Sequence, residues 1–151
     1  GYYIKDSVWN TARKYKIHTR YANGVEMVIA GGYPEIPMGT KWIGDEGWVW
    51  VSRKGMQASD ERLLSMKFGP GDVQLERTRS HQHNFIDCVR TRRQTLTPCE
   101  IAHRSFTPGV LGQISMLLDR KLRFDPVNEK ILGDEQANSM LGRPMRRPWT
   151  I

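Results

Sequence analysis

The string His103-Arg104-Ser105 holds the best pair of ligand-binding side chains in this chain. An imidazole and a guanidinium can both donate hydrogen bonds, either to a sugar hydroxyl or to a carboxylate. A purely structural role is the alternative for both residues. We name His103 and Arg104 as candidate substrate-binding residues.

Two further candidates lie earlier in the sequence. Asn84, beside Phe85, could orient a substrate or a loop, and a hydrogen bond at the start of a helix would explain it as well. Trp42, with Trp48 and Trp50, could form a wall on which a sugar ring stacks. The alternative is that these rings pack in a core or an interface. Asn84 and Trp42 join the candidate substrate-binding set.

No metal site and no catalytic residue is predicted. Cys99 and His103 are four residues apart and would share one face of a helix, but no third ligand lies near them. His81 and His83 would share a face only on a strand, and a helix is expected there. The sequence has no Ser-His-Asp or Cys-His arrangement and no carboxylate pair with a glycosidase layout.

The size and composition are those of one globular domain. The chain has 151 residues, of which 38% are hydrophobic, and a chain of this length buries roughly 70% of its unfolded surface. Cys88 and Cys99 are too few for a disulfide framework and are expected to be buried thiols on helices. No apolar run approaches the roughly 20 residues of a membrane span, so no membrane partner is expected.

The formal net charge of +7 raises the question of a nucleic-acid partner. The distribution of the charge argues against one, because arginines gather at the end of one predicted helix and in the C-terminal tail while the others are scattered. No helix-turn-helix, zinc finger or paired aromatic platform is present to read bases. The interpretation is a solvated basic surface without a nucleic-acid partner.

The elements that must position these residues begin with a predicted hairpin. Residues 14–21 alternate with the period of two that is typical of a strand, and residues 25–30 return as its antiparallel partner. Asn23-Gly24 predicts a type I′ turn between them.

Two more strands are predicted after a loop over residues 31–40. They span 41–44 and 48–53 around the turn Asp45-Glu46-Gly47. Tryptophan and valine alternate over 48–51, so both faces of this sheet are apolar and need cover. Since helices are available for only one face, the other is predicted to be the contact surface of a homo-oligomer.

The second half is predicted to be mainly helical. Ser80 is the expected cap of a helix that ends at Arg92. Thr97 and Glu100 predict a capping box with Pro98 at the first helical position, and this second helix should run toward Leu118.

Turn residues mark the second helix and the C-terminal segment after it. Pro108-Gly109 is expected to kink or interrupt the helix. Short strands over 121–124 and 130–132 are expected around the Asp125-Pro126 turn, and after them a last helix that Asp134 caps and that ends near Gly142.

The order of these pieces resembles a known family. The stretches HQHNFIDCVRTRR, TPCEIAHRSF, LLDRKLRFDPVNEKILGDEQAN and RPMRRPWTI resemble the end of the Gfo/Idh/MocA oxidoreductases, at residues 81–93, 97–106, 117–138 and 143–151. YANGVEM and KWIGDEGWVWV, at 21–27 and 41–51, resemble the sheet of the same family's C-terminal domain.

The resemblance implies an enzyme of two domains. An N-terminal Rossmann domain would hold NAD or NADP, and a C-terminal α+β domain would form part of the substrate pocket and the oligomer interface. This chain has no G-x-G-x-x-G, no Glu-Lys-Pro with the family's catalytic lysine, and none of the glycine-rich motif that opens the C-terminal domain. No cofactor site is therefore expected within it.

The sequence thus predicts an α+β fold, a mostly antiparallel open sheet with helices packed on one face. Residues 1–151 are interpreted as a single C-terminal substrate and oligomerisation domain that lacks the Rossmann domain. It would serve an NAD(P)-dependent oxidoreductase acting on a sugar, a cyclitol or a related alcohol, without being catalytic alone. The alternative is an independent module that binds carbohydrate or an acidic ligand. A cytoplasmic and an exported location both stay open.

Overall fold

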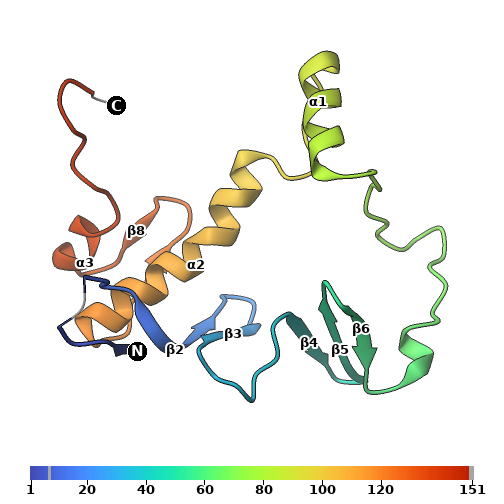
Figure 1. Ribbon diagram of the computed structural model, residues 1–151, viewed down its shortest axis with the longest axis horizontal. Coiled ribbons are helices and arrows are strands. Elements are labelled where there is room, and N and C mark those ends of the chain that lie inside the picture. Colours follow the sequence, from blue (N-terminus) through green and yellow to red (C-terminus); the bar gives the residue numbers. More distant parts are fainter. Residues whose placement is uncertain (7, 150–151) are drawn as a thin grey trace. The chain divides into compact units, whose positions relative to one another are not determined.

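The structure, a computed structural model, describes residues 1–6 and 8–149, and the chain forms two compact units. One unit consists of Gly1–Tyr33 and Thr97–Ile151, and the other of Pro34–Leu96. Figure 1 labels their helices and most of their strands. Helices and antiparallel strands make up both units, which confirms the predicted α+β class. Within residues 1–6 and 8–149, the strands lie in two three-stranded sheets and one two-stranded sheet.

The predicted hairpin is confirmed in the first unit. Strand β2 (Ala12–Arg20) pairs with β3 (Glu26–Gly31) in an antiparallel register that sets Ile17 opposite Ile29 and His18 opposite Val28. Strand β1 (Tyr2–Tyr3) joins the other side of β2 near its start only. Beyond Lys14, that side of β2 has no strand partner among the described residues.

The predicted type I′ turn of this hairpin is wrong. Only Gly24 has a positive φ, of 87°, whereas a type I′ turn needs positive φ at both central residues. The Gly24 N–H donates to the Tyr21 carbonyl and the Tyr21 N–H donates to the Val25 carbonyl, so the loop contains three residues. Asn23 contributes its side chain instead, because its Oδ1 accepts a hydrogen bond from the Val25 N–H.

Helix α2 (Cys99–Leu118) crosses the first unit, but the predicted capping box does not form. Pro98 is the N-cap residue and makes no side-chain capping bond, and Glu100 instead pairs with Arg104 one turn later. Of the two effects expected at Pro108-Gly109, the interruption is wrong, since the helix continues through Pro108 to Leu118. A long helix packed on other elements can keep such a proline at the loss of one internal hydrogen bond.

The core of the first unit lies between α2 and the elements after it. The strands β7 (Phe124–Asp125) and β8 (Lys130–Ile131) form a small antiparallel ladder, and α3 (Glu135–Ser139) comes next. Ile114 of α2, Ile131 of β8 and Ala137 of α3 are buried together. Both strands are shorter than predicted, and α3 ends before Gly142.

The predicted cap of α3 is confirmed. The Asp134 side chain accepts a hydrogen bond from the Ala137 N–H, and it pairs with Arg120 at 2.8 Å. These hydrogen bonds, that of Arg120 first, hold the pKa of Asp134 below its usual range. The cap therefore ties α3 to the segment after α2.

Gly112 allows α2 to approach β2 closely. A Cβ atom at this position would lie 2.5 Å from Cδ1 and 2.6 Å from Cγ2 of Ile17. Only a glycine leaves room for the Ile17 side chain at the helix surface. The position of Ile17 on β2 thereby sets where α2 packs.

The second unit holds the tryptophan-rich sheet. Strands β4 (Thr40–Gly44), β5 (Gly47–Ser52) and β6 (Gly55–Ala58) form an antiparallel meander, with the 3₁₀ turn η1 (Glu61–Leu63) after it. The two predicted strands are confirmed, and β6 was not predicted. The register sets Trp42 opposite Val49 and Ile43 opposite Trp48.

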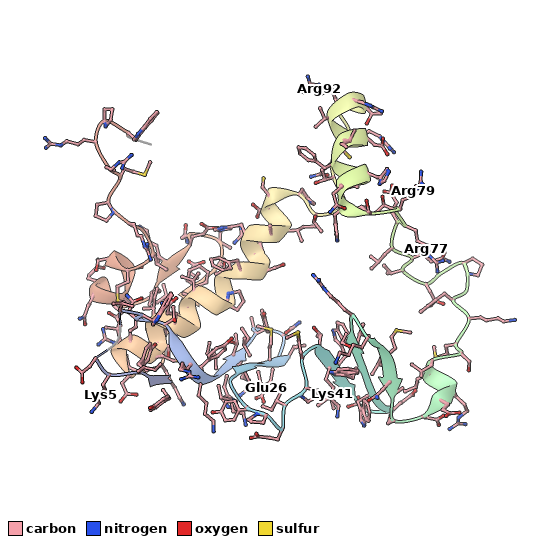
Figure 2. The ribbon with its side chains drawn as sticks, viewed as in Figure 1. Lys5, Glu26, Lys41, Arg77, Arg79 and Arg92 are labelled. Carbon is pink, nitrogen blue, oxygen red and sulfur yellow. The ribbon has the colours of Figure 1, made fainter. Side chains whose placement is uncertain are left out.

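This register separates the three tryptophans. Directly opposed residues share a face of a sheet, so Trp42 lies on the face of Val49 while Trp48 and Trp50 lie on the other face. On that other face the Lys41 amino group lies 3.9 Å from the centre of the Trp48 ring (Figure 2). The three rings therefore do not form a single wall for a sugar, which was one of the two interpretations that the sequence allowed.

The second unit ends with α1 (His81–Thr91), and its predicted cap is confirmed. The Ser80 side chain accepts from the His83 N–H, and Arg92, with φ of 59°, ends the helix. The prediction of two buried thiols is correct for Cys88 only, because Cys99 is exposed at the start of α2. Among the described residues, no helix is long and apolar enough to cross a membrane.

Candidate functional site

A groove of about 700 Å³ lies in the first unit between the β2–β3 hairpin and α2. Its helix wall is formed by residues spaced three or four apart, which are Arg104, Thr107, Pro108, Leu111, Gly112 and Ser115. The hairpin contributes residues 17–22 and 26–28, and the segment after α2 contributes Lys121, Leu122, Phe124 and Pro126. Sites for small molecules have volumes of about 300–1,000 Å³, so the groove has the size of a ligand site.

One end of the groove carries a cluster of charged side chains around Arg104. The Arg104 Nε donates to Glu100 Oε1 at 2.8 Å, and its Nη1 donates to the Pro126 carbonyl at 2.6 Å. The same Nη1 lies 3.3 Å from Glu129 Oε1. The hydrogen bond to Glu100 is the largest cause that raises the pKa of Arg104 above its usual value.

His103 lies beside this cluster and does not line the groove. Its Nε2 is 2.9 Å from Glu129 Oε1, so it helps to hold the turn after β7 against α2. Of the predicted pair, Arg104 is therefore a groove residue and His103 supports it from outside. The structural role that the sequence left open for both residues is present in both.

The charge balance at Arg104 decides what this end can bind. Two carboxylates lie within 3.3 Å of one guanidinium, so the positive charge is already compensated. A further carboxylate would meet repulsion from Glu100 and Glu129. A neutral hydroxyl group, which both donates and accepts, can use the remaining Nη2 donors and the carboxylate oxygens.

Two hydroxyl groups lie farther along the helix wall of the groove, among apolar side chains. Thr107 Oγ1 donates to the His103 carbonyl at 2.8 Å, and Ser115 Oγ donates to the Arg120 carbonyl at 2.7 Å. Because each hydroxyl proton is already used, both oxygens face a ligand as acceptors. Thr107 and Ser115 lie three and eleven positions after Arg104, and this helical spacing is the sequence signal that places all three on one face of α2.

Asn84 and Trp42 belong to the second unit and do not line this groove. Asn84 has a structural role, since its Oδ1 accepts from the Leu96 N–H at 3.1 Å and its Nδ2 lies 3.7 Å from the sulfur of Cys88. Trp42 is 59% exposed and borders a shallower hollow of about 460 Å³ beside Asp45 and Glu46. The structure thus gathers one of the four candidates, Arg104, into the groove.

The residues present do not fit a metal ion or a dinucleotide. Within residues 1–6 and 8–149, no group of three His, Cys, Asp or Glu side chains could hold a metal ion. A dinucleotide needs a glycine-rich turn that leads from a strand into a helix N-terminus. The segments before α1 and α2, RTRS and TLTP, contain no glycine, so they do not suit the pyrophosphate.

Comparison with known proteins identifies the family. Residues 5–151 match the family described as "Oxidoreductase family, C-terminal alpha/beta domain". No curated protein matches the chain, and no solved structure does. The match covers nearly the whole sequence and includes every helix and strand described above except β1. The chain therefore belongs to the Gfo/Idh/MocA oxidoreductase family, as its C-terminal domain.

Proposed function

We propose that this domain forms the substrate side of an NAD(P)-dependent oxidoreductase that acts on a sugar, a cyclitol or a related alcohol. The observation that carries the proposal is the family match over residues 5–151. The groove beside α2 supports it, because it joins a polar cluster to an apolar wall in a space of suitable size.

At its Arg104 end, the groove fits the neutral hydroxyls of a polyol better than the carboxylate of a sugar acid. The Arg104 cluster presents donors and acceptors with its charge compensated by Glu100 and Glu129. Thr107 and Ser115 add acceptors farther along the helix. Leu111 and Phe124 supply apolar surface for the carbon face of a ring.

The hydride chemistry is proposed to come from another domain. NAD or NADP would accept or return the hydride, and a Rossmann domain outside these 151 residues would hold it. The residues described here would bind and orient the alcohol. We also propose that the domain assembles into a homo-oligomer through an open face of its sheet.

Ligand titration of the chain tests the groove. We expect chemical shifts of the groove residues to move when myo-inositol or glucose is added, and gluconate to bind more weakly than glucose. Arg104→Gln should weaken polyol binding by about tenfold or more, because hydrogen bonds to a charged donor are lost.

The matched control is Arg62→Gln in the second unit. Arg62 is also exposed and pairs with one nearby carboxylate, that of Asp60, but it does not line the groove. The Arg62→Gln substitution should leave polyol affinity unchanged. Tighter binding of gluconate than of glucose would contradict the proposed ligand class. An equal loss of polyol affinity in Arg104→Gln and Arg62→Gln would also contradict it.

A further inference from the structure

Glu129 ends the loop between β7 and β8 in a backbone conformation that is uncommon for glutamate. The two strands pair Asp125 with Lys130, so residues 126–129 form the loop. Glu129 is the last of these residues and has φ of 51°, in the left-handed region. Glycine is the usual residue there, and a larger side chain is kept in it only where the surrounding structure fixes the backbone. The contacts of the Glu129 side chain are therefore expected to offset this strain.

The Glu129 carboxylate joins the loop to two neighbouring side chains of α2. Its Oε1 lies 2.9 Å from His103 Nε2 and 3.3 Å from Arg104 Nη1. In the same loop, the Pro126 carbonyl accepts from Arg104 Nη1 at 2.6 Å. All of these contacts are made within the first unit.

The loop that carries Glu129 is held in shape by Asp125. Asp125 Oδ1 accepts from the N–H groups of Val127 and Asn128 at 2.9 and 3.2 Å, and its Oδ2 accepts from Asn128 Nδ2 at 2.7 Å. These hydrogen bonds, that of the Asn128 side chain first, hold the pKa of Asp125 below its usual range. Because the loop is tied to the end of β7, it presents the Glu129 carboxylate at a fixed place beside α2.

These contacts orient the guanidinium group of Arg104. Glu100 uses its Nε, and Pro126 and Glu129 use its Nη1. Within the part of the chain that the structure describes, the N–H groups of Nη2 are thus left to donate to a ligand in the groove that Arg104 lines. Glu129 also places a negative charge next to these donors, so it opposes a ligand carboxylate that would bind there.

The two carboxylates at Arg104 have different explanations. Glu100 precedes Arg104 by four residues on the same helix, a spacing at which ion pairs stabilise helices, and its side chain is 68% exposed. Glu129 comes from a separate segment, and its side chain is 44% exposed. Helix stability accounts for Glu100, whereas it does not account for Glu129 or its strained backbone.

We propose that Glu129 determines the ligand specificity of the groove by acting through Arg104. It holds the guanidinium group so that Nη2 binds ligand hydroxyls, and its charge makes the corresponding sugar acids bind more weakly. Glu129 does not itself line the groove, so it is a positioning residue. This inference rests on the proposed function and assigns the choice of a neutral ligand to one residue.

Glucose and glucuronate test this role, because they share a pyranose ring and differ at C6, where glucuronate carries a carboxylate. By titration calorimetry, the unmodified chain should bind glucose more tightly. Glu129→Gln keeps the size of the side chain and an oxygen that can accept from Arg104, so glucose affinity should change little. Glucuronate affinity should rise on the order of fivefold, because one negative charge is removed roughly 5 Å from the ligand carboxylate.

The matched control is Asp119→Asn in the same unit. Asp119 has nearly the same φ, 49°, is exposed and does not line the groove. Its replacement changes the net charge by the same amount, so the ratio of glucuronate to glucose affinity should stay that of the unmodified chain. A shift of this ratio as large as that in Glu129→Gln would show an effect of net charge alone and would overturn the inference.

Glu129→Gly separates a role in binding from a role in folding. Glycine adopts a positive φ without strain, so the loop should still form and circular dichroism should not change. Glucose affinity should fall by about threefold or more, because Arg104 loses one of its anchors. Asp119→Gly should leave glucose affinity unchanged. If Glu129→Gly binds glucose as tightly as the unmodified chain, Glu129 does not act through Arg104 and the inference is overturned.

The outcomes separate this inference from the proposed function. If the unmodified chain prefers glucose and Glu129→Gln leaves the affinity ratio unchanged, the role of Glu129 is overturned while the proposed function survives. If the unmodified chain binds neither sugar, or binds glucuronate more tightly than glucose, the proposed ligand class is wrong and the inference is overturned with it.

Discussion

At the residue scale, Asp134 combines two roles that depend on its charge. Its carboxylate caps α3 and pairs with Arg120, and both contacts favour the ionised form. The pKa in the folded state is lowered from about 3.8, its value in an unfolded chain. The stability that this lowering contributes is present above that pH and is lost as the pH falls through the folded pKa.

We predict that Asp134→Asn lowers the urea midpoint of unfolding at neutral pH and that the difference from the unmodified chain shrinks in acid. Asparagine can still cap a helix, so the loss reports mainly the pair with Arg120. In an Arg120→Gln background, Asp134→Asn should have a smaller effect. A difference that stays constant from neutral pH to acid would contradict this account.

Gly112 gives a second prediction at this scale. Gly112→Ala should destabilise the chain by about 1–3 kcal/mol, because the new methyl group overpacks against Ile17. Gly109→Ala is the matched control in the same helix, since no atom lies within 4 Å of a Cβ there. It should stabilise the chain by about 0.5–1 kcal/mol through helix propensity.

Urea unfolding of both variants measures this contrast. Ile17→Val in the Gly112→Ala background should recover part of the loss by removing a methyl group from the contact. Equal effects of Gly112→Ala and Gly109→Ala would show that α2 does not depend on this close approach to β2.

At the element scale, the predicted caps of α1 and α2, two of the three predicted helix caps, had opposite outcomes. Ser80 caps α1 through the His83 N–H, whereas Thr97 makes no capping bond with α2. We predict that Ser80→Ala costs about 1 kcal/mol through the lost cap. Thr97→Ala, an exposed position without such a bond, should change the free energy of unfolding by less than about 0.5 kcal/mol.

The same urea experiment, read through the helix signal in circular dichroism, compares the two caps. The Ser80 variant should lose helix signal at lower urea concentration than the unmodified chain. If Thr97→Ala lowers the free energy of unfolding as much as Ser80→Ala does, the capping box of α2 does form.

The elements that the sequence predicted well are those with local signals. Alternation indicated the β2–β3 hairpin, and an acidic or hydroxyl side chain three residues before a free N–H marked the starts of α1 and α3. The wrong predictions concern residues for which a tertiary contact competes with a local preference. Glu100 has two possible partners, the start of its own helix and Arg104, and the structure pairs it with Arg104. Pro108 breaks an isolated helix more readily than one held by packing on both sides.

The groove could be predicted only in part for the same reason. Arg104 was recognised by its residue type, but its compensation by Glu129 depends on a contact between residues 25 positions apart. Trp42 was grouped with Trp48 and Trp50 by composition, and only the pairing register places it on the other face. Contacts between distant segments decide which side chains share a site, and periodicity within one segment does not report them.

At the scale of the whole molecule, charge and cofactor binding have to be separated. The chain carries a formal net charge of +7, so it will attract the phosphates of any dinucleotide at low ionic strength. Such attraction between exposed charges is screened beyond about 8 Å at physiological salt. Specific dinucleotide binding instead needs a glycine-rich turn and a helix N-terminus around the pyrophosphate, which these residues do not supply.

We therefore predict that NADH and NADPH give no saturable binding heat with this chain at physiological ionic strength. Any heat at low salt should fall steeply as salt is added, and it should be matched by inorganic pyrophosphate, which carries the charge without the nicotinamide. Polyol titration under the same conditions is the positive control, because the groove beside α2 lies within the chain. Saturable, salt-resistant binding of NADH with micromolar affinity would mean that the domain holds its own cofactor. It would contradict the proposal that a separate Rossmann domain binds NAD or NADP.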